Sequence, residues 1–304
     1  MRRLIPLASL TLIAAGPLSG QDLAGRSDRT FTLNEPVPEG GWVRVATFNG
    51  RIEITQGSGS RVEVRAAKEL RRGDIQDIGF VVRRERDGIT ICAVWANGDE
   101  CDSSGNYHST GRSRNWSQDH QGTVDFTVRI PAGVRVKAAS GNGDVSISGA
   151  GAEVIAATGN GRLDIAGSSG PVRASTGNGE VTVQDARGPV EVSTGSGEVR
   201  VVTSTGPVSA NTGNGDIDVS IGRVDRSPDM SFRTGNGRVT LRLPAGFGAE
   251  LEASTGNGAV STDFPVQLQS GRIDRTRLRG TLGGGGGRLS ISSGNGDVEI
   301  LRQR

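Results

Sequence analysis

The 304-residue sequence contains few aromatic, histidine or cysteine side chains. Aromatic residues make up 4% of it, only two residues are histidine, and the hydrophobic fraction is 34%. No Phe, Tyr or Trp occurs between Thr127 and Ser231, and neither His nor Cys follows Gln121. Sugar-cleaving clefts usually present flat aromatic platforms, so this scarcity argues against such a cleft in the second half. We predict no catalytic residues and no cofactor.

The sequence also lacks a strong excess of either charge, with 35 Lys and Arg against 33 Asp and Glu. Arg2 and Arg3 precede the apolar stretch Leu4–Ala15, a pattern typical of a secretory signal peptide, which we place at residues 1–20. Its removal takes two of the 35 basic residues and leaves 33 against 33, which argues against nucleic-acid binding. We expect an exported protein (periplasmic, at the cell surface or secreted) with no transmembrane span in the mature chain.

Cys92 and Cys101 are the only cysteines. An exported chain meets an oxidising environment, so we predict a disulfide between them, with two free thiols as the alternative. No histidine lies at ligand spacing, so a zinc site is not indicated. Calcium-binding repeats also give 18-residue coils, but Arg162 and Arg238 stand where such a repeat needs an acid. We predict no metal site.

Glycine is abundant, with 48 residues, and much of it lies in a repeated tripeptide. Gly-Asn-Gly, or once Gly-Ser-Gly, begins at Gly141, Gly159, Gly177, Gly195, Gly213, Gly235, Gly256 and Gly294. The first four intervals are 18 residues, the next two are 22 and 21, and the last is 38. The last interval fits two coils, one of them degenerate.

Small apolar residues alternate with polar ones on both sides of each tripeptide, which predicts two short strands per coil with one buried face. The tripeptide is the corner, because glycine and asparagine tolerate positive φ. We predict an all-β fold, a parallel β-helix (solenoid) of roughly 18-residue coils in which successive turns of chain stack directly; an antiparallel β meander is the alternative. Stacked corners would form an amide ladder of Asn142, Asn160, Asn178, Asn214, Asn236, Asn257 and Asn295.

The chain divides by regularity into residues 21–127, which we interpret as irregular β coils capping the stack, and the regular repeats of residues 128–304. A polar insertion at residues 103–121 follows Cys101. Loops carry function more often than scaffolds, so this segment is a possible recognition loop, although a flexible polar loop is the simpler interpretation. Its candidate residues are Tyr107, His108, Arg112, Arg114 and Trp116.

These motifs resemble the bacterial putative-adhesin β-strand-repeat family, a family of unknown function. The resemblance is carried by the Gly-Asn-Gly-Asp-Val corners, by Ile130–Val134, by Leu243–Gly246 and by the closing stretch Leu289–Ile300. It extends roughly from Trp42 to Ile300. The resemblance implies an exported β-helical protein and provides no catalytic residues to carry over.

The leading functional hypothesis is therefore an exported, non-enzymatic protein used for binding, adhesion or structure in the cell envelope. Its partner would be an unidentified envelope, surface or polysaccharide component. The alternatives are a carbohydrate-active parallel β-helix enzyme, which would need a carboxylate pocket, and a periplasmic scaffold or sensor partner.

Overall fold

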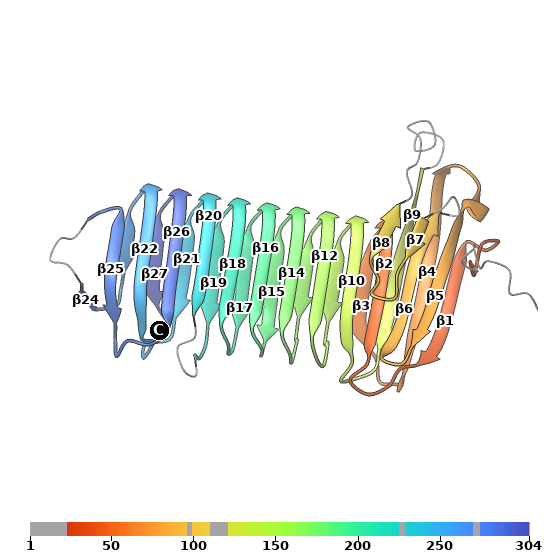
Figure 1. The fold of residues 1–304 in the computed structure, drawn as a ribbon, viewed down its shortest axis with the longest axis horizontal. Helices are drawn as coiled ribbons and strands as arrows, with labels where there is room; N and C mark the ends of the chain where they lie inside the picture. Colours follow the sequence, from red (N-terminus) through yellow and green to blue (C-terminus); the bar gives the residue numbers. More distant parts are fainter. Residues whose placement is uncertain (1–22, 96–98, 110–120, 225–228, 270–273, 304) are drawn as a thin grey trace, which may run out of the picture.

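The computed structural model describes residues 23–95, 99–109, 121–224, 229–269 and 274–303. These residues form two large β-sheets that run along one elongated stack (Figure 1). Their helical content is a single 3-10 turn at Ile75–Asp77, and no helix among them is long and apolar enough to cross a membrane. The predicted all-β parallel solenoid is confirmed, and the antiparallel meander is wrong for the repeats.

The larger sheet, called sheet A here, has 13 strands. In spatial order they are β24 (Val266–Leu268), β25 (Arg277–Leu282), β22 (Ala249–Asn257), β26 (Arg288–Asn295), β20 (Met230–Asn236), β18 (Val208–Asn214), β16 (Val190–Ser196), β14 (Val172–Asn178), β12 (Val154–Asn160), β10 (Arg135–Asn142), β2 (Trp42–Asn49), β6 (Gly88–Trp95) and β5 (Ile78–Glu85).

The second sheet, called sheet B, has 12 strands. In spatial order they are β1 (Thr30–Pro36), β4 (Arg61–Arg72), β9 (Gln121–Ile130), β3 (Ile52–Gln56), β11 (Val145–Ser148), β13 (Leu163–Ala166), β15 (Val181–Ala186), β17 (Val199–Thr203), β19 (Ile217–Ile221), β21 (Val239–Leu243), β27 (Val298–Arg302) and β23 (Val260–Thr262). A separate antiparallel hairpin consists of β7 (Asp99–Cys101) and β8 (Tyr107–Ser109).

Each regular coil gives one strand to each sheet, and equivalent residues of neighbouring coils lie side by side. For example, Val136 pairs with Val154 in sheet A, and Val145 pairs with Leu163 in sheet B. Because side chains alternate between the two faces of a strand, every second residue points between the sheets. These inward residues are mostly valine, alanine and isoleucine, and they are fully buried. Mostly small side chains therefore fill a narrow interior in the regular coils.

The corners need glycine at both ends of the tripeptide because the backbones of neighbouring coils approach closely there. Gly179 has φ +152°, and a Cβ at this position would lie 1.9 Å from the Gly161 carbonyl oxygen. A Cβ at Gly177 would lie 2.5 Å from the Gly159 carbonyl oxygen. Both glycines are therefore required by the stacking, in addition to the turn conformation.

The asparagine amides along the corners form two hydrogen-bonded runs. Within each run, every asparagine after the first donates Nδ2 to the Oδ1 of the preceding asparagine, at 2.6–2.8 Å. Ser196 stands between the runs, in register with Asn178 and Asn214. The first run is Asn49, Asn142, Asn160 and Asn178, and the second is Asn214, Asn236, Asn295 and Asn257.

A buried hydroxyl before each tripeptide adds a second row of hydrogen bonds. Each Oγ donates to the carbonyl of the glycine that ends the adjacent coil's corner tripeptide, at 2.7–3.1 Å. A row of valines would fill the same space but leave these carbonyls without this partner. The donors are Ser140, Thr158, Thr176, Thr194, Thr212, Thr234, Thr255 and Ser293.

The coils do not follow chain order at the two ends of the stack. The last coil, β26–β27, lies between the β20–β21 coil and the β22–β23 coil. At the other end, β2–β3 lies between β6–β9 and β10–β11. The expectation that successive turns of chain always stack directly is therefore wrong at both ends. The 38-residue interval does not hold two coils either, because β25 runs antiparallel on β22.

Two short loops carry the chain past these intercalated coils. Residues 131–134 connect β9 to β10, and residues 244–248 connect β21 to β22. Both loops contain Pro-Ala-Gly. In the second loop the Phe247 amide donates to the Pro244 carbonyl at 2.9 Å, and the Gln303 amide donates to the Leu243 carbonyl at 2.8 Å. The chain thus leaves one coil position open, and a segment distant in sequence fills it.

Aromatic side chains close the N-terminal end of the interior. The rings of Phe31 and Phe80 stack at 4.4 Å, and Phe126 meets Phe80 edge-on at 6.0 Å.

Lys68 is buried at the same end of the stack. It is 2% exposed, and burial lowers its pKa from 10.5 to about 8. Its Nζ donates to the carbonyls of Gly25 at 2.6 Å, Ile78 at 2.7 Å, Arg26 at 3.2 Å and Ile75 at 3.4 Å.

Candidate functional site

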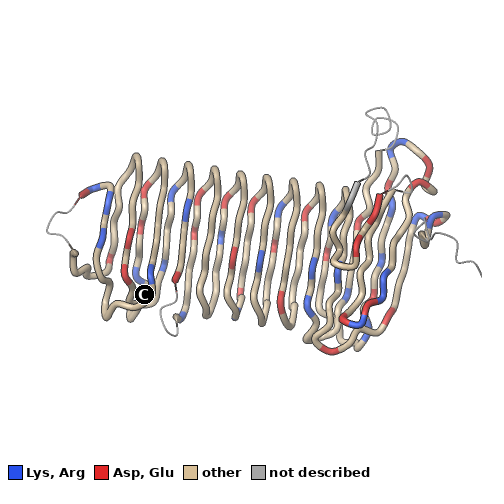
Figure 2. Tube along the Cα trace, in the orientation of Figure 1, with Lys and Arg blue, Asp and Glu red and all other residues tan. Residues whose placement is uncertain are grey.

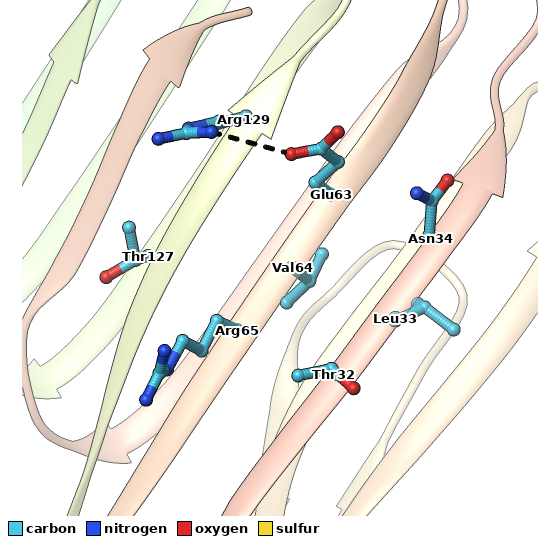
Figure 3. A pocket seen from close by; sticks show the side chains of 8 residues that line it. All are labelled: Thr32, Leu33, Asn34, Glu63, Val64, Arg65, Thr127 and Arg129. Carbon is cyan, nitrogen blue, oxygen red and sulfur yellow. Dashed lines mark ion pairs between the residues drawn. The ribbon is translucent and has the colours of Figure 1, made fainter.

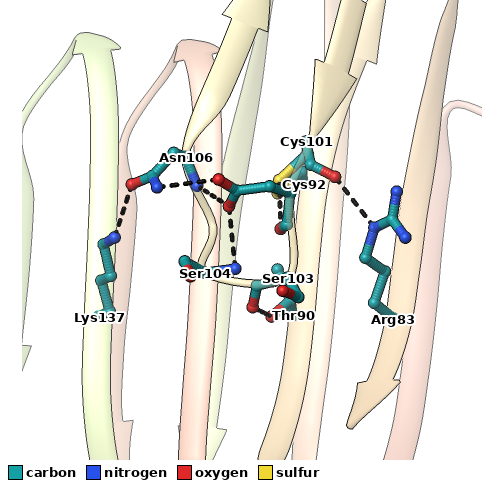
Figure 4. The surroundings of a disulfide bond; sticks show 9 residues. Arg83, Thr90, Cys92, Cys101, Ser103, Ser104, Asn106 and Lys137 are labelled. Atoms are coloured by element: carbon teal, nitrogen blue, oxygen red, sulfur yellow. Dashed lines mark hydrogen bonds between the residues drawn. A yellow bond between two sulfur atoms is a disulfide. The ribbon is translucent and has the colours of Figure 1, made fainter.

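A hairpin covers part of the outer face of sheet A near the N-terminal end of the stack. It consists of β7, β8 and the turn between them, and we call residues Asp99–Ser109 the flap. The flap contacts β6 through β7 and β2 through β8 (Figures 1 and 4). It therefore interrupts the regular outer surface of the solenoid.

The predicted disulfide joins the flap to the sheet. Cys92 lies on β6 and Cys101 on β7, and both are fully buried. The alternation of β6 turns Cys92 to the outer side, because its neighbours Ile91 and Ala93 belong to the main core between the sheets. The bond thus fixes the flap directly onto the outer face of sheet A.

Side chains of the sheet also hold the flap through hydrogen bonds, drawn in Figure 4. Arg83 Nε donates to the Cys101 carbonyl at 3.0 Å, Thr90 Oγ1 donates to the Ser103 carbonyl at 2.8 Å, and Lys137 Nζ donates to Asn106 Oδ1 at 2.8 Å. Burial lowers the pKa of Lys137.

The turn of the flap is organised by one carboxylate. Asp102 Oδ1 accepts from the amides of Ser104 at 2.9 Å and Asn106 at 2.8 Å. Its Oδ2 accepts from Asn106 Nδ2 at 2.9 Å. A short carboxylate side chain that accepts from backbone amides two and four residues later fixes the conformation of a turn by itself. The flap is therefore an ordered element.

Apolar residues lie beneath the flap, outside the main core. Ala46, Val81 and Val94 form a separate buried cluster with the two cysteines. On an uncovered outer face these side chains would be exposed to water, which is unfavourable for apolar surface. The composition of β2, β5 and β6 therefore matches the presence of a cover over them.

An aromatic pair stands at the edge of the flap. The Phe48 ring lies 5.7 Å from the Tyr107 ring, and Phe48 is 39% exposed. Phe48 occupies the corner position that is glycine in the regular coils, just before Asn49 and Gly50. The prediction missed Phe48, although the departure of Thr-Phe-Asn-Gly from the regular corner was the available signal.

The predicted recognition residues are only partly within the described structure. Tyr107 and His108 lie on β8. Arg112, Arg114 and Trp116 lie outside the described residues, so their recognition role stays a prediction. Residues 103–109 of the predicted insertion belong to the flap.

The outer face of sheet B is hollowed at the same end of the stack (Figure 3). The hollow has a volume of 710 Å³. Arg129 lies 3.8 Å from Glu63 within it, and both side chains are more than half exposed, so this ion pair contributes little stability. The hollow offers guanidinium and hydroxyl groups to a polar ligand. Its lining is Thr32, Leu33, Asn34, Glu63, Val64, Arg65, Thr127 and Arg129.

Charged residues of both signs are interspersed along the stack (Figure 2). Arg173, for example, lies 3.0 Å from Glu153 and 3.5 Å from Glu191 on neighbouring coils. Such exposed pairs are each worth about 0–1 kcal/mol. The repeat places such opposite charges side by side, as with Arg173 and Glu191 on neighbouring strands.

Asp216 and Asp218 are close in sequence, but each carboxylate has a different partner. Asp216 accepts from the Arg238 amide at 2.8 Å, and Asp218 pairs with the Arg242 guanidinium. Burial raises the pKa of Asp164, which lies on an outward strand position. Within the described ranges, no group of three His, Cys, Asp or Glu side chains is placed to hold a metal ion.

Two facing sheets of parallel strands with an 18-residue register define this protein as a parallel β-solenoid. Residues 102–301 match the model of the Toastrack DUF4097 family, so the chain belongs to that family. This membership confirms the resemblance noted in the sequence. No curated protein matches the sequence.

The solved structures that are similar to the chain include two with adhesion-related names. A putative cell adhesion protein from Clostridium sporogenes is 12% identical with a TM-score of 0.28, covering 90% of this chain and 100% of its own. A putative adhesin from Bacteroides fragilis is 14% identical with a TM-score of 0.46, covering 91% of this chain and 99% of its own. At such low identity these structures carry no information about a ligand or activity of this chain.

Proposed function

We propose that this protein is an exported, non-enzymatic solenoid that binds an envelope, surface or polysaccharide partner through the flap end of a rigid stack. The flap carries the proposal, because a disulfide and three side-chain hydrogen bonds hold it on an otherwise regular surface. A structural disulfide of this kind persists in oxidising compartments, which supports export. An adhesin or an envelope-associated structural protein both fit this arrangement.

The aromatic pair beside the flap supplies the contact surface in this proposal. Phe48 and Tyr107 present flat apolar area next to polar turn groups, and such amphipathic surfaces are enriched where proteins bind partners. The regular coils carry glycine where Phe48 stands, so the fold itself does not require an aromatic ring there.

The direct test compares Phe48→Gly with the control Val202→Ser in the full mature chain. Val202 is also an exposed apolar residue, 44% exposed, but it lies on β17 in the middle of sheet B. Labelled protein is sedimented with isolated cell envelopes and with insoluble polysaccharides, after circular dichroism has shown that both variants are folded. We expect Phe48→Gly to reduce the bound fraction several-fold and Val202→Ser to leave it unchanged. Equal binding by all three proteins would refute the flap end as the binding surface.

Export and the absence of enzymatic activity need separate measurements. Cell fractionation with thiol trapping should find the protein outside the cytoplasm with Cys92 and Cys101 oxidised. Recovery from the cytoplasm with both thiols free would refute export. A polysaccharide turnover screen separates the binding protein from a β-helix enzyme, since robust turnover would overturn the non-enzymatic part of the proposal. Crosslinking to one envelope protein without cell adhesion would favour the scaffold or sensor role.

A further inference from the structure

The intercalated coil at the C-terminal end makes the same contacts as a coil that follows its neighbour in sequence. Leu289 pairs with Met230 of β20 on one side and with Leu251 of β22 on the other. Its corner asparagine, Asn295, donates to Asn236 at 2.6 Å and accepts from Asn257 at 2.6 Å. Nothing in this register depends on which chain supplies the coil.

The hydroxyl row and the backbone ladder at the corner are also complete at this coil. Ser293 Oγ donates to the Gly237 carbonyl at 2.8 Å, and Thr255 Oγ1 donates to the Gly296 carbonyl at 2.7 Å. In the backbone, the Gly237 amide donates to the Asn295 carbonyl at 2.7 Å. The position between β20–β21 and β22–β23 is thus a slot shaped for one Gly-Asn-Gly coil.

The coil reaches its slot through a run of five glycines, Gly283–Gly287. This hinge joins β25 to β26, and β22 lies between those two strands in sheet A. Strands two positions apart are separated by about 9.6 Å, twice the usual spacing of about 4.8 Å. The hinge therefore passes around the N-terminal end of β22, where the Glu250 amide donates to the Gly287 carbonyl at 3.0 Å. Glycine gives it the conformational freedom to take other paths.

We propose that the slot also accepts Arg288–Arg302 from a second copy of this chain, which gives a reciprocal coil-exchanged dimer. Each copy then fills the slot of the other with identical contacts, so the interface is two-fold symmetric. The balance between the closed monomer and the dimer is set by the hinge and by protein concentration. The exchange joins two stacks at their C-terminal ends and places the two flaps at opposite ends of the dimer. The inference rests on the topology and is independent of the proposed function.

The first test traps the exchange with single cysteines in otherwise unaltered chains. Arg233 and Ser292 are register partners on β20 and β26, and neighbouring positions of this kind lie within disulfide range. A chain carrying Arg233→Cys is mixed with one carrying Ser292→Cys, unfolded and refolded together at high concentration, and oxidised. We expect a covalent heterodimer well above the yield of the control mixture of Arg233→Cys and Ser175→Cys, because β14 is three coils from β20. Equal yields in the two mixtures would overturn the proposal.

The second test shortens the hinge. Deletion of Gly284–Gly287 leaves one residue between β25 and β26, and the two Cα–Cα steps of at most about 3.8 Å each are shorter than the separation of about 9.6 Å across β22. We expect this variant to have twice the monomer mass by light scattering, with wild-type circular dichroism. A variant with three added hinge residues should stay monomeric. A shortened variant that remains a folded monomer, or that forms only irregular aggregates while the cysteine trap is also negative, would refute coil exchange.

Discussion

Completing the asparagine run at Ser196 should stabilise the stack. Ser196 lies in register with Asn178 and Asn214, where the two hydrogen-bonded runs stop. In Ser196→Asn, the new Nδ2 would donate to Asn178, and the new Oδ1 would accept from Asn214, as in every other coil of the runs. A net hydrogen bond contributes about 0.5–1.5 kcal/mol. Because the rim is solvated, we take the lower end of that range, so two bonds should raise the free energy of unfolding by about 1 kcal/mol.

The opposite substitution, Asn160→Ser, removes the hydrogen bonds of Asn160 with Asn142 and Asn178. We expect a loss of about 1 kcal/mol, since the same two bonds are removed. The assay is urea unfolding followed by circular dichroism, with the midpoints compared at an unchanged slope. A midpoint that rises in Ser196→Asn and falls in Asn160→Ser supports a cooperative ladder. If Ser196→Asn leaves the midpoint unchanged or lowers it, the reasoning from amide stacking to stability is wrong.

Three further changes test a corner glycine, the disulfide and the buried lysine. Gly179→Ala should prevent normal stacking, because its Cβ would lie 1.9 Å from a carbonyl oxygen, whereas Gly246→Ala meets nothing within 4 Å and should leave the melting temperature nearly unchanged. Replacing Cys92 and Cys101 by serine opens a loop with a sequence separation of 9, and the chain-entropy relation then gives a loss of about 2.7 kcal/mol in urea unfolding. The pKa of Lys68 is lowered from 10.5 to about 8 in the folded state, so between those pH values the unfolded chain binds more protons. The free energy of unfolding should therefore rise with pH across that window, and a pH series on Lys68→Met should show a smaller rise.

The regular part of the fold could be predicted because its determinants are local. Alternating small apolar residues on both sides of a glycine corner define two strands and an inward face, and the constant interval defines the register. The order of the coils at the ends could not be predicted in this way. Leu289 fits equally well beside Met230 or Leu251, so the repeat carries no information about which coil is its neighbour.

The flap was predictable in part. The cysteine count and the expected export predict its disulfide, but the hydrogen bonds from Thr90 and Lys137 depend on residues far from the flap in sequence. Phe48 was missed because its departure from the regular corner marks an exception, but the sequence does not show which coil lies beside it. The structure supplies that neighbour: β6 lies beside β2, and it does not carry the Gly-Asn-Gly corner.

The intercalated ends and their antiparallel strands solve one physical problem of a solenoid together. A plain stack of parallel coils would end in open strand edges that could add further coils of the same kind, a known route to aggregation. Here the last pairing is antiparallel at three of the four sheet ends, β24 on β25, β5 on β6 and β1 on β4. Sheet B ends at the C-terminal side of the stack in β23, a strand of three residues that runs parallel to β27. The coil β26–β27 then ties this closing layer to the rest of the stack, because β22 reaches β20 only through β26. The parallel edge left at this end is only three residues long, so association between two copies through this end should proceed by exchange of the intercalated coil and not by simple addition at the edge.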